Sequence, residues 1–216
     1  KSKGKVISPL EFVDKYGADA LRMGILVGGN TGARTTAFVP EKIKGYRNFA
    51  NKIWNMGRFI ELMENEYVEA SGESLPAFTI ALMNEALLSH DKDLIQKYKN
   101  TVISVTESME KFRFMDAGNE IYHFLWHEIA DVYIEDVKNR EGDGKKIGLS
   151  VLKFVYKECL KLLHPFMPFV TEAIWESMCK CEDDNCAGKA ADINGSEKCE
   201  CEFCVSLSVC EWPKIA

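Results

Sequence analysis

Apolar residues recur every three or four positions along most of the chain, and this spacing predicts amphipathic α-helices. In residues 41 to about 65 the apolar positions fall on one helical face, and they are Ile43, Tyr46, Ala50, Ile53, Gly57 and Ile60. Three later stripes have the same spacing: Leu94, Tyr98, Val102, Val105, Met109 and Phe112; Ile121, Leu125, Ile129, Val132 and Tyr133; and Leu152, Val155, Cys159 and Leu162. Such helices, joined by short loops, bury their apolar faces against one another. We therefore predict a mainly α protein built as an antiparallel helical bundle.

Residues with strong helix-boundary preferences divide the first 41 positions. Ser8-Pro9-Leu10-Glu11 combines an N-cap residue, a proline at the first helical position and a glutamate at the third, and it predicts a capping box at the start of a short helix. Gly17 can end that helix in the left-handed conformation, and a second apolar stretch follows over residues 19–26. Pro40-Glu41 then begins the long helix.

Helix breakers and caps place the later connections. Residues 66–80 contain Ser, Gly and Pro and are expected to form a loop. Asp116 is expected to be the N-cap of the third stripe, and Glu-Gly-Asp-Gly at 141–144 to form the turn before the fourth. The prolines of His-Pro-Phe-Met-Pro at 164–168 are expected to end one helix and allow a last one over 169–178.

Composition is that of a globular protein, and the charge is unevenly spread. Of the 216 residues, 46% are hydrophobic and 11% aromatic, which is ample for a core. No run approaches the roughly 18 apolar residues needed to cross a bilayer, so we expect no membrane association and a cytoplasmic location. Residues 1–60 carry eleven Lys or Arg and four Asp or Glu, a net +7, and the remaining residues sum to −13. This asymmetry is typical of a local phosphate-binding surface, although lysines that only solvate one end give the same count.

One candidate binding surface lies opposite the core face of the long helix. Arg47, Asn51, Asn55 and Arg58 follow one another at spacings of three or four and form a row of hydrogen-bond donors. Donors of this kind suit ribose and phosphate oxygens. A solvated helix face has the same composition, so RNA contact and simple solvation both stay open.

Several strings resemble the class I aminoacyl-tRNA synthetases of the valine, isoleucine and leucine group. The strings are KSKG at 1–4, YGADALR at 16–22, GYRNFANKIWN at 45–55, WHEIADVYIE at 126–135 and LHPFMPFVTEAIW at 163–175. The last string occurs in all three synthetases. The strings at 45–55 and 126–135 resemble the valyl-tRNA synthetase family most, with the isoleucyl family as the nearest rival.

The resemblance implies that Lys1 and Ser2 end the K-M-S-K-S loop, which binds ATP in the family. It assigns ATP binding to Lys1, Ser2, Lys3 and Gly4, and the catalytic role to Lys1. Loop lysines neutralise the ATP phosphates while the valine carboxylate attacks the α-phosphorus. ATP and Mg²⁺ are then cofactors of the parent enzyme. The alternative is that these four residues are only a solvated terminus.

The resemblance further implies a C-terminal fragment that lacks the catalytic and editing domains and is inactive alone. Its expected parts are 1–40, the loop end and a stem-contact segment; 41–178, an anticodon-binding bundle; 179–206, a Cys-rich acidic insertion; and 207–216, a tail. The expected partner is tRNA, valine tRNA in particular, bound by a monomer through the row Arg47, Asn51, Asn55 and Arg58. An isoleucyl or leucyl fragment, and a free-standing non-enzymatic RNA-binding helical scaffold, are the alternatives.

Other side chains with chemical potential are expected to be structural. Trp54 and Trp126 fall among core positions and are expected to pack there. The histidines His123, His127 and His164 have no surrounding ligand or base constellation in the sequence.

Seven of the eight cysteines fall between residues 179 and 210. In a cytosolic protein such a cluster favours metal over disulfides. Two pairs have spacings close to those of a tetrahedral structural zinc site: Cys181 with Cys186, and Cys201 with Cys204. The acidic and Gly-Ser-containing surroundings suit a surface loop equally well, so a structural Zn²⁺ ion is one of two interpretations. Cys159, on an apolar stripe, is expected to be a small core residue.

Overall fold

The structure is a computed structural model, and it describes residues 8–28, 40–75, 87–178 and 206–214. Within these ranges every regular element is helical, which confirms the predicted mainly α bundle. The elements are α1 (Pro9–Tyr16), α2 (Ala18–Leu26), α3 (Pro40–Ser71), α4 (Ser89–Glu110), α5 (Phe114–His123), the π-helical η2 (Phe124–Tyr133), α6 (Ile134–Lys138), α7 (Gly142–Leu163), α8 (Pro168–Met178) and the 3₁₀ turn η3 (Leu207–Val209).

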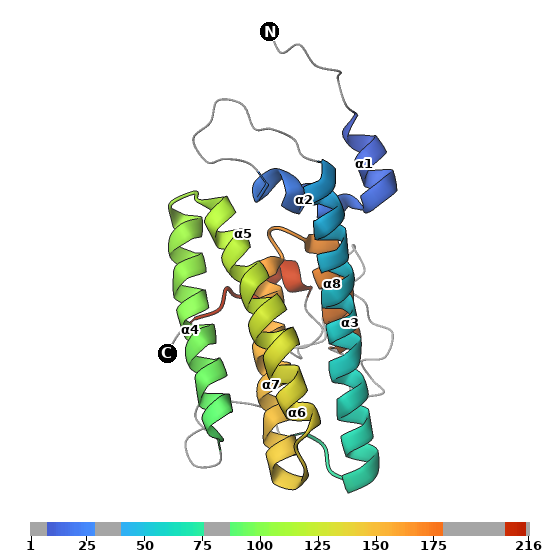
Figure 1. The fold of residues 1–216 in the computed structure, drawn as a ribbon, viewed down its shortest axis with the longest axis vertical. Coiled ribbons are helices and arrows are strands. Elements are labelled where there is room, and N and C mark those ends of the chain that lie inside the picture. Colours follow the sequence, from blue (N-terminus) through green and yellow to red (C-terminus); the bar gives the residue numbers. More distant parts are fainter. Residues whose placement is uncertain (1–7, 29–39, 76–86, 179–205, 215–216) are drawn as a thin grey trace, which may run out of the picture.

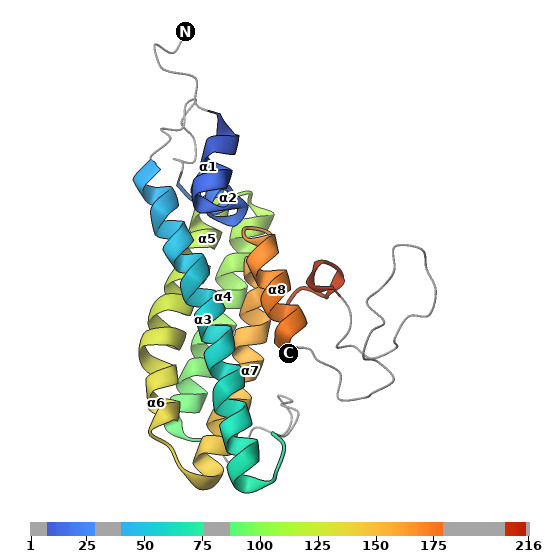
Figure 2. The same cartoon turned by 90° about the vertical axis from the view of Figure 1, so that its right-hand side faces the viewer.

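The long helices lie side by side and successive ones run in opposite directions (Figure 1). Helices α3, α4 and α7 and the continuous rod α5–η2–α6 span the length of the bundle, and the shorter α8 lies beside α3 (Figure 2). The small helices α1 and α2 lie across one end of the bundle (Figure 1). The α4–α5 turn lies at the same end (Figure 1).

The predicted apolar stripes form the core, with two exceptions. Phe49, Ile53, Leu125 and Leu152, for example, are fully buried. Phe112, placed on the second stripe, lies beyond the end of α4 and is 77% exposed. Val132, placed on the third stripe, is 60% exposed. Its neighbourhood is π-helical, and the wider turn of a π-helix changes which residues face the core.

Helix boundaries agree with the prediction at α1, α2, the start of α3 and α8, and they differ at three other places. Helix α1 begins at Pro9 and ends before Gly17, whose φ is +89°, but the Ser8 side chain makes no cap hydrogen bond, so the predicted capping box does not form. Helix α3 continues to Ser71, which makes the loop expected from residue 66 wrong over its first six positions.

Two later helix starts also differ from the prediction. Helix α5 begins at Phe114, so Asp116 is its third residue and not its N-cap. Helix α7 begins at Gly142, inside the predicted turn.

Helix α2 is attached to the bundle through the start of α8. The buried Asp19 carboxylate accepts hydrogen bonds from the backbone N–H groups of Phe169 (3.1 Å to Oδ1) and Val170 (2.7 Å to Oδ2). Beside it, Arg22 Nη2 donates to the carbonyl oxygen of Pro165 at 2.9 Å. Asp19 therefore caps α8 from a helix about 150 residues earlier in the chain.

A buried polar cluster fixes the opposite end. Asp91, at the start of α4, is 0% exposed and accepts hydrogen bonds from the Tyr133 hydroxyl (2.7 Å) and the Leu88 N–H (2.9 Å). Arg140 Nη2 lies 2.7 Å from the same carboxylate, and its Nε donates to Asp136 at 2.9 Å. Burial raises the pKa of the Tyr133 hydroxyl, which keeps it protonated as a donor. The cluster joins the start of α4 to η2 and to the connection before α7.

Candidate nucleic-acid interface

The outward face of α3 carries the four predicted donors, Arg47, Asn51, Asn55 and Arg58, and all four are exposed. Trp54 lies among them in the sequence and is 37% exposed. The expectation that Trp54 packs in the core is therefore wrong. Its position one residue from the core residue Ile53 suggested burial, but no neighbouring helix covers it fully.

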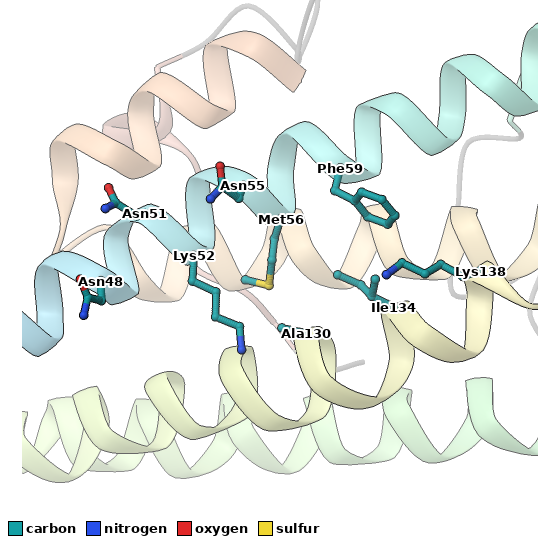
Figure 3. Close-up of a pocket in the computed structure, with 9 residues that line it drawn as sticks. All are labelled: Asn48, Asn51, Lys52, Asn55, Met56, Phe59, Ala130, Ile134 and Lys138. Atoms are coloured by element: carbon teal, nitrogen blue, oxygen red, sulfur yellow. The ribbon is translucent and has the colours of Figure 1, made fainter.

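A groove of about 470 Å³ runs beside this face, between α3 and the η2–α6 part of the long rod (Figure 3). Its lining consists of Asn48, Asn51, Lys52, Asn55, Met56, Phe59, Ala130, Ile134 and Lys138. Met56 and Ile134 are buried and make an apolar floor, whereas the three asparagines are exposed at the rim. The groove thus combines an apolar base with amide and ammonium groups.

The structure brings only two of the four predicted donors into this groove. Asn51 and Asn55 line it. Arg47 lies nearer the α1 end, where its Nη1 donates to the carbonyl oxygen of Lys15 at 3.5 Å. Arg58 lies on the other side of α3, in a small depression that Trp54 and residues of α8 also line. The four donors that follow one another at helical spacing in the sequence therefore lie on two sides of α3.

Both groove lysines lie over aromatic rings. Lys138 Nζ is 4.7 Å from the centre of the Phe59 ring and 2.6 Å from Glu135 Oε1. Lys52 Nζ is 3.8 Å from the centre of the Trp126 ring. Figure 3 shows Lys52 extending from α3 towards the opposite wall and Lys138 pointing towards Phe59. Cations over aromatic faces are held in place by the ring quadrupole, so both charges are oriented at the groove.

Asp131 fixes the Lys52 side of the groove. Its carboxylate lies 2.8 Å from Lys52 Nζ and 3.2 Å from His127 Nδ1. The hydrogen bond from Lys52 lowers the pKa of the Asp131 carboxyl, which stays ionised. Trp126 stacks on Tyr122 with ring centres 5.5 Å apart, in agreement with its predicted packing role.

Asn48, Asn51 and Asn55 form no side-chain hydrogen bond with any other residue in the described ranges. Each amide offers one carbonyl acceptor and two N–H donors. Three such amides beside an apolar floor can hydrogen-bond the edge of a planar ring while its face packs below. Unpaired RNA bases are recognised by this combination of edge hydrogen bonds and stacking.

Sequence reasoning missed most of this groove. Asn48, Lys52, Phe59 and Lys138 were not predicted as site residues. The two walls are far apart in the sequence, since Lys52 and its partner Asp131 are 79 residues apart, and no local pattern indicates the pairing. The string at 45–55 contained four of the lining residues, but only as part of a resemblance.

Residues 91–216 match the family described as the anticodon-binding domain of tRNA ligases. The chain belongs to this family. The predicted fold class and the family resemblance are both confirmed by this match and by the helical architecture. The matched range includes the η2–α6 wall of the groove, whereas α3 precedes it.

Curated relatives of this anticodon-binding domain are valine–tRNA ligases. That of Bacillus cereus (strain ATCC 10987 / NRS 248) is 37% identical over 186 residues, which are 82% of this chain and 20% of the relative. That of Geobacter sulfurreducens is 40% identical over 182 residues, with the same two coverages. That of Agrobacterium fabrum is 38% identical over 179 residues, 81% of this chain and 18% of the relative. The chain therefore spans about a fifth of the length of these relatives.

A solved structure shares the fold at low sequence identity. It is the ternary complex of the Agrobacterium radiobacter K84 LeuRS with tRNA and LeuAMS, and its TM-score is 0.61 at 19% identity. The similarity covers 85% of this chain and 20% of that one.

The remaining predicted site residues lie outside the described ranges. These are the ATP-loop residues Lys1, Ser2, Lys3 and Gly4 and the zinc candidates Cys181, Cys186, Cys201 and Cys204. Among the described residues no group of three His, Cys, Asp or Glu side chains could hold a metal ion. Cys159 is buried, as predicted for a core residue. None of the described helices combines the length and apolar character that crossing a membrane requires.

The histidines form no common constellation in the described structure. His164 Nδ1 lies 2.8 Å from the Thr171 hydroxyl oxygen, and burial lowers the pKa of its imidazole. His123 and His127 stack on the surface of the long rod, with ring centres 5.6 Å apart.

Proposed function

We propose that this chain is the tRNA-binding part of a valine–tRNA ligase and that the α3–η2/α6 groove contacts unpaired bases of the tRNA. The observation that carries the proposal is the groove itself, in which three unpaired amides lie over an apolar floor beside two oriented lysines. The family match and the names of the curated relatives support tRNA as the ligand and valine as the amino acid of the parent enzyme.

In the groove, each group has a distinct part in binding. The Phe59 ring and the Met56 side chain offer surfaces on which a base packs. The amides of Asn51 and Asn55 exchange hydrogen bonds with its edge. Lys52 and Lys138 contact the backbone phosphates on either side of the base. To do so they leave their ion pairs with Asp131 and Glu135, which are exposed and therefore weak.

The parent enzyme supplies the chemistry that the chain does not contain. We propose that it joins valine to tRNA with ATP and Mg²⁺ in the cytoplasm, and that Lys1, Ser2, Lys3 and Gly4 belong to its ATP loop with Lys1 as the catalytic residue. The domain limits 1–40, 41–178, 179–206 and 207–216 and the monomeric state stay predictions. A structural Zn²⁺ ion held by Cys181, Cys186, Cys201 and Cys204 also stays a prediction.

Binding of the chain to tRNA across a salt series tests the proposal. Valine tRNA, isoleucine tRNA and valine tRNA with an exchanged anticodon are the probes. We expect binding that weakens with salt, because lysines near phosphates release counterions on binding. We also expect valine tRNA to be favoured and the anticodon exchange to remove that preference. Equal binding of all three at every salt concentration would instead favour a general RNA-binding scaffold.

Groove variants locate the contact. Asn51→Ala and Asn55→Ala each remove about one net hydrogen bond of roughly 1 kcal/mol, so each should weaken valine tRNA binding about fivefold. Both side chains are exposed, so folding is preserved. Asn65→Ala, an exposed asparagine on the same helix outside the groove, is the matched control and should bind as the wild type does. Unchanged affinity of the Asn51→Ala/Asn55→Ala double variant contradicts the groove assignment.

A further inference from the structure

The turn between α4 and α5 places a phenylalanine where helices usually have glycine. Helix α4 ends with two crossed backbone hydrogen bonds, from Phe112 N to Met109 O (3.0 Å) and from Arg113 N to Ser108 O (2.8 Å). This is the Schellman arrangement, in which the residue corresponding to Phe112 takes the left-handed conformation. Its φ is +56°, and no other non-glycine residue in the described ranges has a positive φ.

Folding does not explain a phenylalanine at this position. In the left-handed conformation an L side chain places its Cβ too close to the following carbonyl oxygen, and glycine avoids that cost. The ring is 77% exposed, so burial offsets little of the strain. Its one ring contact in the described structure is an edge-to-face approach to Phe114, with centres 6.1 Å apart. A strained and exposed aromatic side chain points to a role outside the fold.

The surroundings of the ring favour a nucleic acid. Lys111 and Arg113 flank Phe112 in the sequence, and both are exposed. Their acidic neighbours are Glu107, 3.0 Å from Lys111, and Asp116, 3.8 Å from Arg113. The two partners of each pair are three or four residues apart and lie on the surface. Such exposed ion pairs are weak, so a phosphate can replace the carboxylate. Proteins that bind single-stranded nucleic acid without sequence preference use this combination: an aromatic ring stacks on a base, and nearby cations contact the phosphates.

We propose that Phe112 is a stacking contact for an unpaired base of the bound tRNA, separate from the groove. This inference rests on the proposed function. From Phe114 at the start of α5 to Ala130 in the groove wall are 16 residues of one rod, which at 1.5 Å per residue is roughly 25 Å. The ring therefore meets a different part of the RNA from the groove. The turn between α4 and α5, to which Phe112 belongs, lies at the bundle end that carries α1 and α2 (Figure 1).

Substitution by glycine separates binding from folding. Phe112→Gly relieves the strain and keeps the Schellman turn, so its melting temperature should rise above that of the wild type. If the ring stacks on a base, the same variant should bind a valine tRNA transcript about 5- to 100-fold more weakly. Phe112→Tyr keeps the ring and should bind as the wild type does. Ile103→Ala, which removes a half-exposed apolar side chain from α4, is the matched control and should not change affinity.

The salt dependence adds a second readout. Phe112→Gly removes no charge, so the slope of log affinity against log salt should stay as in the wild type, whereas Lys111→Ala should reduce it by about one. If Phe112→Gly binds as tightly as the wild type while Asn51→Ala/Asn55→Ala binds weakly, the stacking contact is refuted and the groove stands. If the wild-type chain binds no tRNA at low salt, both proposals are wrong.

Discussion

Replacing Asp19 by alanine removes the carboxylate through which α2 holds the start of α8. Asp19 is 8% exposed and accepts the backbone N–H groups of Phe169 and Val170 at 3.1 and 2.7 Å. A buried N–H without a partner costs about 1–3 kcal/mol. These two donors belong to the first turn of α8 and water can reach them once the side chain is gone, so we take the lower value for each. The expected loss is about 2 kcal/mol.

Thermal and urea unfolding of the chain measure this loss. In a domain of this size about 1 kcal/mol corresponds to 2–4 °C, so Asp19→Ala should lower the melting temperature by roughly 4–8 °C. Asp14→Ala, on the exposed side of α1, is the matched control and should unfold as the wild type does. If the two variants unfold within about 0.5 kcal/mol of each other, the cap does not stabilise the α2–α8 contact.

Asp19 also gives the stability of the fold a predicted dependence on pH. Burial raises the pKa of the Asp19 carboxyl above its ordinary value of 3.8, although the two backbone N–H groups act in the opposite direction. The folded state therefore binds this proton more tightly than the unfolded state. The contribution of Asp19 to stability is full below pH 3.8 and declines as the pH rises through the folded pKa. The stability difference between wild type and Asp19→Ala should shrink over this window, and a difference that grows with pH contradicts the direction.

Two further substitutions test the packing of the bundle. Asp91→Ala removes the buried one of the two carboxylates that pair with Arg140, and it also takes the acceptor from the Tyr133 hydroxyl and the Leu88 N–H. Because Asp136 still pairs with Arg140, the expected cost, measured by urea unfolding, is about 3 kcal/mol, the lower end for breaking a buried pair. Gly118→Ala should cost about 1–3 kcal/mol, because the new Cβ would lie 2.2 Å from Val27 Cγ2. Gly45→Ala is its control: nothing lies within 4 Å of that Cβ, so the variant should be stabilised by roughly 0.8 kcal/mol through helix propensity. Equal effects at the two glycines contradict the packing argument.

The sequence was sufficient for those features that local periodicity determines. The core face of α3 and that of α7 follow from apolar residues three or four apart, and each predicted member, such as Ile53 or Leu152, is buried or half-buried. The end of α1 follows from Gly17 alone, because few other residues take a positive φ at low cost. These features need no knowledge of what packs against the helix.

The errors occur where a distant segment decides the outcome. Trp54 sits next to a core residue, yet no neighbouring helix covers it fully. Val132 faces solvent because the segment is π-helical, and nothing in its composition indicates i+5 hydrogen bonds. Nothing in the sequence around Asp19 indicates that its carboxylate caps α8, because the two N–H groups it accepts belong to residues about 150 positions later. The groove was also missed for this reason, because its two walls are far apart in the sequence.

Under the proposed function, RNA would enter the groove without disturbing the core beneath it, because the contact that joins the two walls is exposed. Its two walls are joined at the surface by the Lys52–Asp131 ion pair, whose side chains are 25% and 48% exposed, whereas Met56 and Ile134 below are buried in the bundle. An exposed pair contributes little to stability, so a phosphate can take the place of Asp131 at small cost. The buried cluster around Asp91 and the cap at Asp19 meanwhile hold the two ends of the bundle. RNA that binds as proposed would replace this weak surface contact and leave the spacing between the groove and Phe112 unchanged.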